Sequence, residues 1–251
     1  MRALLAAELL KMRSTRATSL LVLATLVLAV LTVATTVPGF LEENPAISLD
    51  DPDLLAIIVG NGFGAPLVLM TLLGVLAFTQ EFRYGTVTST YLGEPRRARV
   101  LIAKGLSLLV ASTVITAVTL AVTLPLSIAL IRAQDGELSI TAQFWQTVAA
   151  GFVSMAAYAV IGVALGALVT NQIAAVVGVL VWMLAVEQMV IPFYPEAGRW
   201  MLFAAASSFM EIGASYGVQL LPVTMGGLVL LGYTAATVAL AIVVTPRRDV
   251  L

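Results

Sequence analysis

The chain has 251 residues, of which 60% are hydrophobic and only 11% are charged, and its formal net charge is −1. A soluble domain is usually about half apolar and a quarter charged, so this composition indicates a membrane protein. Because the chain contains no cysteine and no histidine, it excludes thiolate and imidazole catalysis and the usual zinc sites. We therefore predict no metal site, and the balanced charge gives no reason to expect a nucleic-acid partner.

Apolar runs of about twenty residues recur along the chain, and that length crosses roughly 30 Å of hydrocarbon as a helix. The strands of a membrane β-barrel would alternate polar and apolar residues, whereas these runs are continuously apolar. We predict an all-α, polytopic membrane protein with one transmembrane domain over residues 1–251 and six spans. The predicted spans are residues 17–37, 54–79, 100–131, 144–169, 173–191 and 223–245.

The connections between the spans have their own signals. Residues 1–16 are predicted to form a helix at the cytosolic membrane surface. Asp51 and Pro52 suit the N-cap and the first position of the second span. The apolar run over residues 144–191 is too long for one span, so we expect a tight turn near Asn171 between the fourth and fifth spans.

The basic residues predict the orientation. All but two of the 13 precede the first span, lie between the second and third, or follow the sixth. The loop over residues 38–53 has acids and no base. Because Lys and Arg mark the cytosolic side, we predict cytosolic termini and a multi-pass protein of the bacterial plasma membrane. Residues 192–222 would then lie on the outer side.

The segment between the second and third spans reads "QEFRYGTVTSTYLGEPRRARVLIAK" and ends at Lys104. Gly85 suits a left-handed residue that ends a helix, and "TVTSTYL" can form one or two helical turns. The third span would restart near Glu94. Arg96 and Arg97 fall in its first turns, where the helix dipole disfavours cations. Either lipid phosphates or an acidic protein partner would favour them there.

This segment resembles the loop after the second span in permease subunits of type-2 ATP-binding-cassette (ABC) transporters. That loop has an acidic-aromatic-Arg/Lys-x-Gly-Thr signature, then a proline and basic residues that lead into L-x-x-K. The matching residues are Glu81, Phe82, Arg83, Gly85, Thr86, Pro95, Arg96, Arg97, Leu101 and Lys104. The N-terminal helix, the six spans and the chain length resemble the same family.

The resemblance implies an ATP-driven export permease for a small or amphipathic substrate. Residues 80–99 would be the coupling loop, which docks on a pair of cytosolic ABC ATPase subunits. A second permease, either a copy or a relative, and membrane lipids would be the other partners. The chain has no G-x-x-x-x-G-K-[ST] phosphate loop, so we expect no enzyme activity and no cofactor of its own. ATP and magnesium would bind the ATPase partner.

Glu187 and Gln188, late in the fifth span, are the candidates for a substrate pathway, because an ionisable residue at membrane depth is costly. Near the outer end, water or a partner side chain could satisfy Glu187 instead. The apolar stretch over residues 192–222 resembles the family's short re-entrant helices, and it could equally be an interfacial anchor. Two other functions stay open: a scaffold or regulatory membrane subunit, and an ion-coupled secondary transporter, for which only Glu187 would serve. Gly162 and Gly166 are expected to allow close helix packing within one chain.

Overall fold

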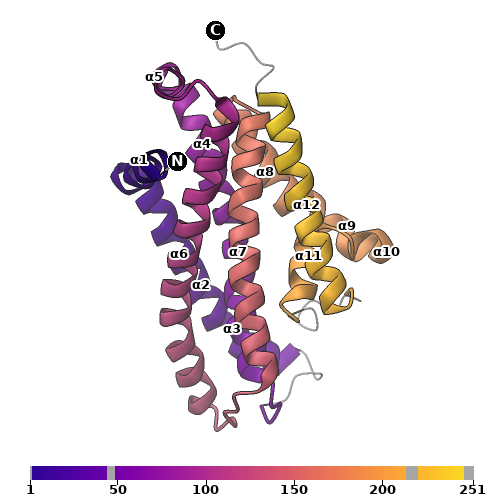
Figure 1. Cartoon of the computed structure of the whole chain (residues 1–251). Coiled ribbons are helices and arrows are strands. Elements are labelled where there is room, and N and C mark those ends of the chain that lie inside the picture. The colour runs from indigo at the N-terminus through magenta and orange to yellow at the C-terminus, as the bar shows by residue number, and fades with distance from the viewer. Residues whose placement is uncertain (1, 44–48, 213–219, 246–251) are drawn as a thin grey trace.

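The computed structural model of the chain describes residues 2–43, 49–212 and 220–245, and within these ranges it contains helices and no strands. The helices are α1 (Arg2–Ser14), α2 (Arg16–Glu43), α3 (Leu54–Gly64), α4 (Pro66–Arg83), α5 (Val87–Gly93), α6 (Arg97–Ala133), α7 (Ala142–Leu168), α8 (Gln172–Val181), the π-helix η1 (Trp182–Val186), α9 (Glu187–Phe193), α10 (Pro195–Gly198), α11 (Leu202–Phe209) and α12 (Val223–Val244). They form an elongated bundle (Figure 1).

Six of these units are long and apolar enough to cross a membrane: α2, α3 with α4, α6, α7, α8 through α9, and α12. The predicted all-α architecture with six membrane-length helices is therefore confirmed for the described part of the chain. α6 has 37 residues, or about 55 Å at the helical rise, so it is longer than the hydrocarbon layer is thick.

The two ends of the bundle differ in charge. α1, α5, the start of α6 and the end of α12 lie at one end, and α1 crosses it at a steep angle to the long helices (Figure 1). We call this the basic end, because Arg96, Arg97 and Arg99 lie there with α1. The opposite end carries acids such as Asp51 and Asp53. Arg247 and Arg248, which entered the predicted orientation, lie outside the described residues.

The second span consists of two helices that meet at Ala65. Pro66 is the first residue of α4, a position where its missing N–H costs nothing. α3 begins at Leu54, the first residue of the predicted span, but the predicted N-cap at Asp51 and helical start at Pro52 are wrong, because Asp53 directly precedes the helix. Asp51 instead accepts a hydrogen bond at 2.8 Å from the N–H of Asp53, as aspartates do in turns.

α4 and α7 pack backbone to backbone at the centre of the bundle. A Cβ atom placed on Gly162 of α7 would collide with the carbonyl oxygen of Thr71, and one on Gly74 of α4 would collide with that of Ala159. Gly166 faces Val75 in the same way. The predicted close packing of the G-x-x-x-G pair thus occurs within this chain.

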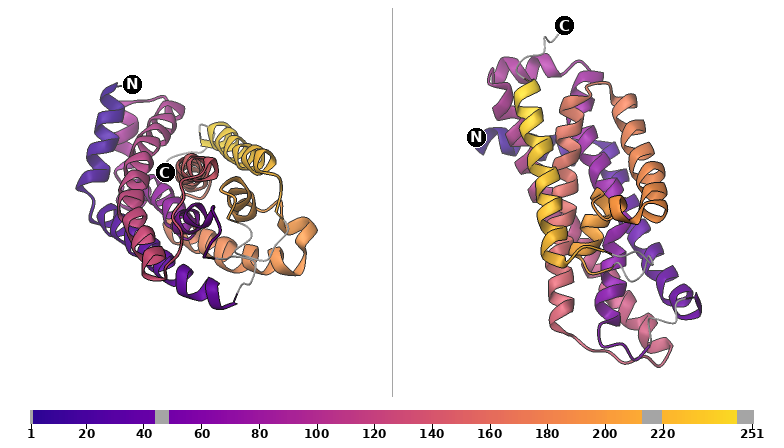
Figure 2. Two further views of the ribbon diagram at one scale, coloured as in Figure 1. Left: turned by 90° about the horizontal axis from the view of Figure 1, so that it is seen from below. Right: turned by 90° about the vertical axis from the view of Figure 1, so that its right-hand side faces the viewer.

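The turn between the fourth and fifth spans lies where we predicted it. The side chain of Asn171 accepts a hydrogen bond from the Ala174 N–H at 3.0 Å and caps α8. The fifth span then continues through η1 and α9. α10 lies away from the bundle axis, and α11 lies beside α12 (Figure 2). Residues 213–219 of the predicted re-entrant region lie outside the described residues.

Candidate functional site

Four charged side chains form a closed ring at the basic end, which we call the ion ring: Glu8 and Lys11 of α1, Glu81 of α4 and Lys104 of α6. The Lys104 Nζ lies 2.6 Å from Glu8 Oε2 and 2.8 Å from Glu81 Oε1. The Lys11 Nζ lies 2.8 Å from Glu8 Oε1 and 2.7 Å from the same Glu81 oxygen. Each carboxylate thus lies between two ammonium groups, and the ring ties three helices together.

Three members of the ion ring are withdrawn from solvent. The side chain of Lys104 is 2% exposed and that of Glu8 is 6% exposed. Lys104 also donates to the carbonyl oxygen of Ala77 at 3.1 Å, so its three donors all have acceptors. A buried charge is costly unless it is paired and hydrogen-bonded, and the ring meets both conditions with a formal charge of zero.

Lys11 closes the ion ring on its solvent side, where its side chain is 47% exposed. Burial by itself would lower the pKa of Lys11, but the hydrogen bonds that it donates to Glu8 and Glu81, together with their negative charges, raise the pKa above its ordinary value. Lys11 is therefore charged at neutral pH. Thr90 of α5 lies 3.5 Å from the Lys11 Nζ, so the ring reaches the loop between α4 and α6.

That loop carries α5 beyond the end of α4 (Figure 1). Gly85 has a φ of +68°, the left-handed conformation expected of it, and it reverses the chain after α4. Val87 is buried and anchors α5 to the bundle. In contrast, Leu92 is 80% exposed and Tyr84 is 69% exposed. The loop therefore presents two large apolar side chains outside the membrane-length helices.

The residues predicted to contact an ATPase lie in two environments. Glu81 faces inward into the ion ring, and the half-buried ring of Phe82 stacks on Phe78 with centroids 5.7 Å apart. The guanidinium of Arg97 lies 5.3 Å from the ring centroid of Tyr91. The exposed residues of the predicted set are Arg83, Gly85, Thr86, Pro95 and Arg96. The structure thus brings the exposed members to the surface of the basic end, whereas Glu81 is buried there in the ion ring.

Sequence reasoning missed Glu8 and Lys11, and it gave Lys104 no partner. One signal was present, because Lys11 and Lys104 are the only lysines of the chain. Glu8 and Lys11 are also three residues apart, which puts both on one face of a helix. What the sequence could not show is that α1 folds back against α4 and α6.

Glu187 is fully buried at the junction of η1 and α9. One carboxylate oxygen accepts a hydrogen bond from Trp182 Nε1 at 2.9 Å, and the other accepts one from the backbone N–H of Phe203 at 2.9 Å. The first N–H groups of a helix have no partner within the helix, so Glu187 holds the start of α11 against the fifth span. Gln188 is exposed. A substrate contact for either residue stays a prediction.

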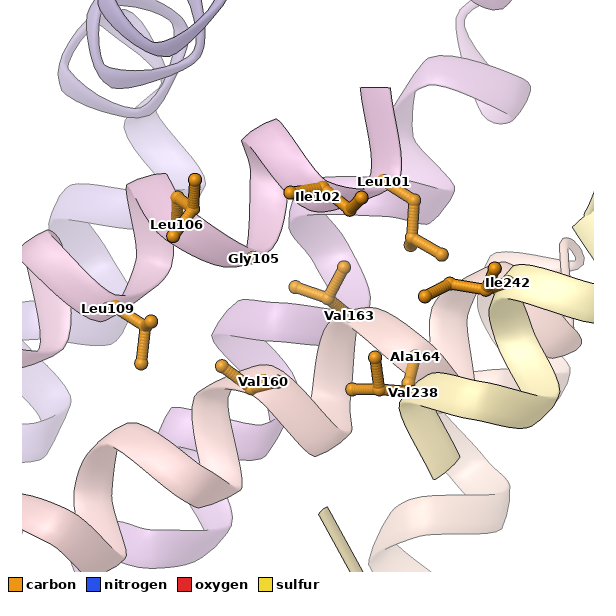
Figure 3. A pocket seen from close by; sticks show the side chains of 10 residues that line it. All are labelled: Leu101, Ile102, Gly105, Leu106, Leu109, Val160, Val163, Ala164, Val238 and Ile242. Carbon is orange, nitrogen blue, oxygen red and sulfur yellow. The ribbon is translucent and has the colours of Figure 1, made fainter. Parts of the chain in front are cut away.

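Two grooves flank α12, which packs on α7 and α11. The groove on one side, between α6 and α12, has a volume of about 170 Å³ and is lined by aliphatic side chains and Gly105 (Figure 3). The groove on the other side, between α8 and α12, has a volume of about 330 Å³. We call them the α6–α12 groove and the α8–α12 groove.

Comparison with known protein families and curated proteins identifies no relative of this chain. No model of a known protein family matches the chain, and a search of curated proteins finds no similar sequence. The function must therefore be argued from the ion ring, the exposed loop and the membrane-length helices.

Proposed function

We propose that this chain is the membrane permease subunit of an ABC-type exporter and that a separate ATPase subunit docks on the loop between α4 and α6. The observation that carries the proposal is the exposure of Tyr84 and Leu92 at the basic end. Large exposed apolar side chains that lie outside the membrane-length helices and next to exposed arginines suit a protein interface. The resemblance of the loop to type-2 ABC permeases supports the same partner.

The ion ring supplies a physical route from such a partner to the membrane. α5 joins the end of α4 to the start of α6, and the ring clamps these two helices to each other and to α1. A force on α5 would therefore move α4 and α6 together. In the proposed cycle, closure of the ATPase pair pushes on α5, and the bundle changes the side to which its pathway opens.

The remaining parts of the proposal follow from the resemblance and the charge pattern. The termini and α5 are cytosolic, and the protein lies in the bacterial plasma membrane. A second permease completes the pathway, and the substrate is small or amphipathic. ATP and magnesium bind the ATPase partner, so this chain performs no chemistry itself.

The direct test is to purify the tagged chain from its native membrane in mild detergent and identify what accompanies it. We expect a soluble ATPase in stoichiometric amount with the wild-type chain. Leu92→Asp should lose it, because a carboxylate would have to be desolvated in an apolar contact. Ile140→Asp is the matched control, since Ile140 is 68% exposed in the connection between α6 and α7.

The outcomes separate the candidate functions. If the intact wild-type chain brings down no ATPase, the exporter assignment fails and a scaffold or regulatory role gains support. If Leu92→Asp retains the ATPase, the docking surface lies elsewhere. Arg83→Ala then tests coupling, and we expect it to lower substrate-stimulated ATP hydrolysis while membrane insertion stays normal. Glu81 is a poorer test residue because its replacement also breaks the ion ring.

A further inference from the structure

The α8–α12 groove is a binding site built by several helices. α8 and α12 form its two walls, α7 lies behind it, and side chains of α4, η1 and α11 complete it. Its lining is mostly aliphatic and includes Leu165 of α7 and Val179 of α8. From Ala174 to Trp182 it follows α8 for about 12 Å at the helical rise. Both walls belong to membrane-length helices, so the groove lies at membrane depth.

The polar atoms of the groove are already used within the chain. Trp182 Nε1 donates to Glu187, and the Tyr233 hydroxyl donates to the carbonyl oxygen of Trp200 at 3.3 Å. The hydroxyls of Thr71 and Thr237 donate to carbonyl oxygens one turn earlier in their own helices. With its side-chain donors satisfied and no charged side chain among the described residues of its lining, the groove offers a ligand mainly apolar contact.

The wall formed by Trp182 is held in place. Trp182 begins the π-helical segment η1, and such segments are rare within helices and are frequently found at functional sites. Glu187 fixes the indole through Nε1 and holds the start of α11, whose Leu202 also lines the groove. The buried carboxylate thus positions two parts of the lining without reaching the groove itself.

We propose that the α8–α12 groove binds one acyl chain of a membrane phospholipid, which enters sideways from the bilayer. At membrane depth the surrounding solvent is hydrocarbon, and an apolar hollow of this kind is complementary to a single flexible chain. The headgroup stays at the membrane surface, because the described lining has no charged side chain to pair with it and its side-chain donors are already used. This inference does not depend on the proposed ATPase partner.

The outer face of α8 favours a lipid over a second copy of the chain as the occupant of the groove. Ile173, Val177 and Val181 are each more than half exposed and share one face of α8, whereas Ala174 and Gly178 line the groove on the neighbouring face. A second copy that packs on the exposed face would leave the groove open. A cavity of about 330 Å³ is also too small for a helix, whose diameter with side chains is about 10 Å.

Gly178 provides a way to fill the groove without disturbing its walls, since a Cβ atom there would have no atom within 4 Å. The same is true of Gly105 in the α6–α12 groove, which makes it the matched control. Each variant, Gly178→Phe and Gly105→Phe, is placed in nanodiscs of phosphatidylcholine that contain a phospholipid with a photoreactive diazirine in its acyl chain. The sites of cross-linking after irradiation are mapped by mass spectrometry.

We expect the wild-type chain and Gly105→Phe to be labelled at Leu165 and Thr237, on α7 and α12, and Gly178→Phe to lose this labelling. Equal labelling of all exposed apolar surfaces, unchanged by Gly178→Phe, would overturn the proposal by showing ordinary contact with surrounding lipid. Because the chain contains no cysteine, Gly178→Cys adds a second measurement. A disulfide-linked dimer formed through it would show a second copy in the groove and would also overturn the proposal.

Discussion

Two glutamates near the ends of the second and fifth spans are both buried, yet they are stabilised in different ways. Glu81 is 8% exposed and accepts hydrogen bonds from two ammonium groups. Glu187 is 0% exposed and accepts hydrogen bonds from two neutral N–H groups, those of the Trp182 indole and the Phe203 backbone. Glu81 therefore joins helices through charge, whereas Glu187 joins them through hydrogen-bond geometry.

The difference predicts how much stability is lost when each group is replaced. In the ion ring, removing one member leaves an uncompensated buried charge, and that is among the most costly changes a protein can suffer. At Glu187, a glutamine of the same shape would keep an acceptor oxygen for one of the two N–H groups, so part of the hydrogen bonding would survive the loss of the charge. The predictions below use this contrast, beginning with the largest expected effect.

Lys104→Met should be the most destabilising change, because it leaves Glu8 and Glu81 facing each other with only the half-exposed Lys11 between them. Breaking a buried ion pair on one side typically costs about 3–5 kcal/mol. The measurement is the unfolding midpoint of the purified protein in detergent, followed by circular dichroism. Arg99→Met is the control on the same helix, since Arg99 forms an exposed pair with Glu94 at 3.7 Å. Equal effects of the two changes would show that the ion ring does not form.

A double variant sharpens this result. Lys104→Met together with Glu81→Leu removes one positive and one negative charge and leaves Glu8 paired with Lys11. We expect the double variant to be more stable than Lys104→Met alone, because the unpaired carboxylate is gone. Additive losses would contradict the coupling of the two residues.

Glu187→Leu should have an intermediate effect, since it leaves the Trp182 and Phe203 N–H groups without an acceptor. An unsatisfied buried donor costs about 1–3 kcal/mol. Glu187→Gln keeps an acceptor oxygen and should cost clearly less than Glu187→Leu. Tryptophan fluorescence during unfolding would follow the change, because Trp182 is a direct partner. Equal losses in the two variants would mean that the charge of Glu187 matters more than its hydrogen bonds.

The smallest effect concerns pH. The pKa of Lys11 is raised in the folded chain above its ordinary value of 10.5, so its contribution is fully present below that pH and is lost as pH rises through the higher folded value. Because Lys11 is half exposed, we expect less than about 1 kcal/mol. Unfolding midpoints measured from neutral to alkaline pH should fall less steeply in Lys11→Met than in wild type. A steeper fall in that variant would contradict the assignment.

Much of the fold could be predicted because hydrophobic length and turn residues act locally. The six apolar runs, the turn near Asn171 and the left-handed Gly85 each depend on a few neighbouring residues, and the structure contains all of them. The N-cap of α3 was misassigned to Asp51 because Asp51 and Pro52 suit a turn as well as a helix N-terminus, and the sequence alone does not separate the two.

The candidate sites were harder to predict because they depend on contacts between distant parts of the chain. Glu8 and Lys104 are separated by 96 positions, and nothing local to either residue indicates the other. Glu187 was correctly singled out as costly, but its burial under α11 depends on the return of the chain through residues 195–209. The two grooves beside α12 also depend on tertiary packing, because they form where α6 and α8 do not cover the sides of α12.

The ion ring has a chemical consequence for anyone who handles this protein. Both lysine ε-amines of the chain lie in the ring, so among the described residues the partly exposed Lys11 is the main target for amine-reactive reagents. Fixatives and cross-linkers that require pairs of amines should therefore react poorly with the folded chain. Lys104 is nearly inaccessible while α1 is in place. The rate at which Lys104 is acylated would therefore measure how often α1 lifts away from the bundle.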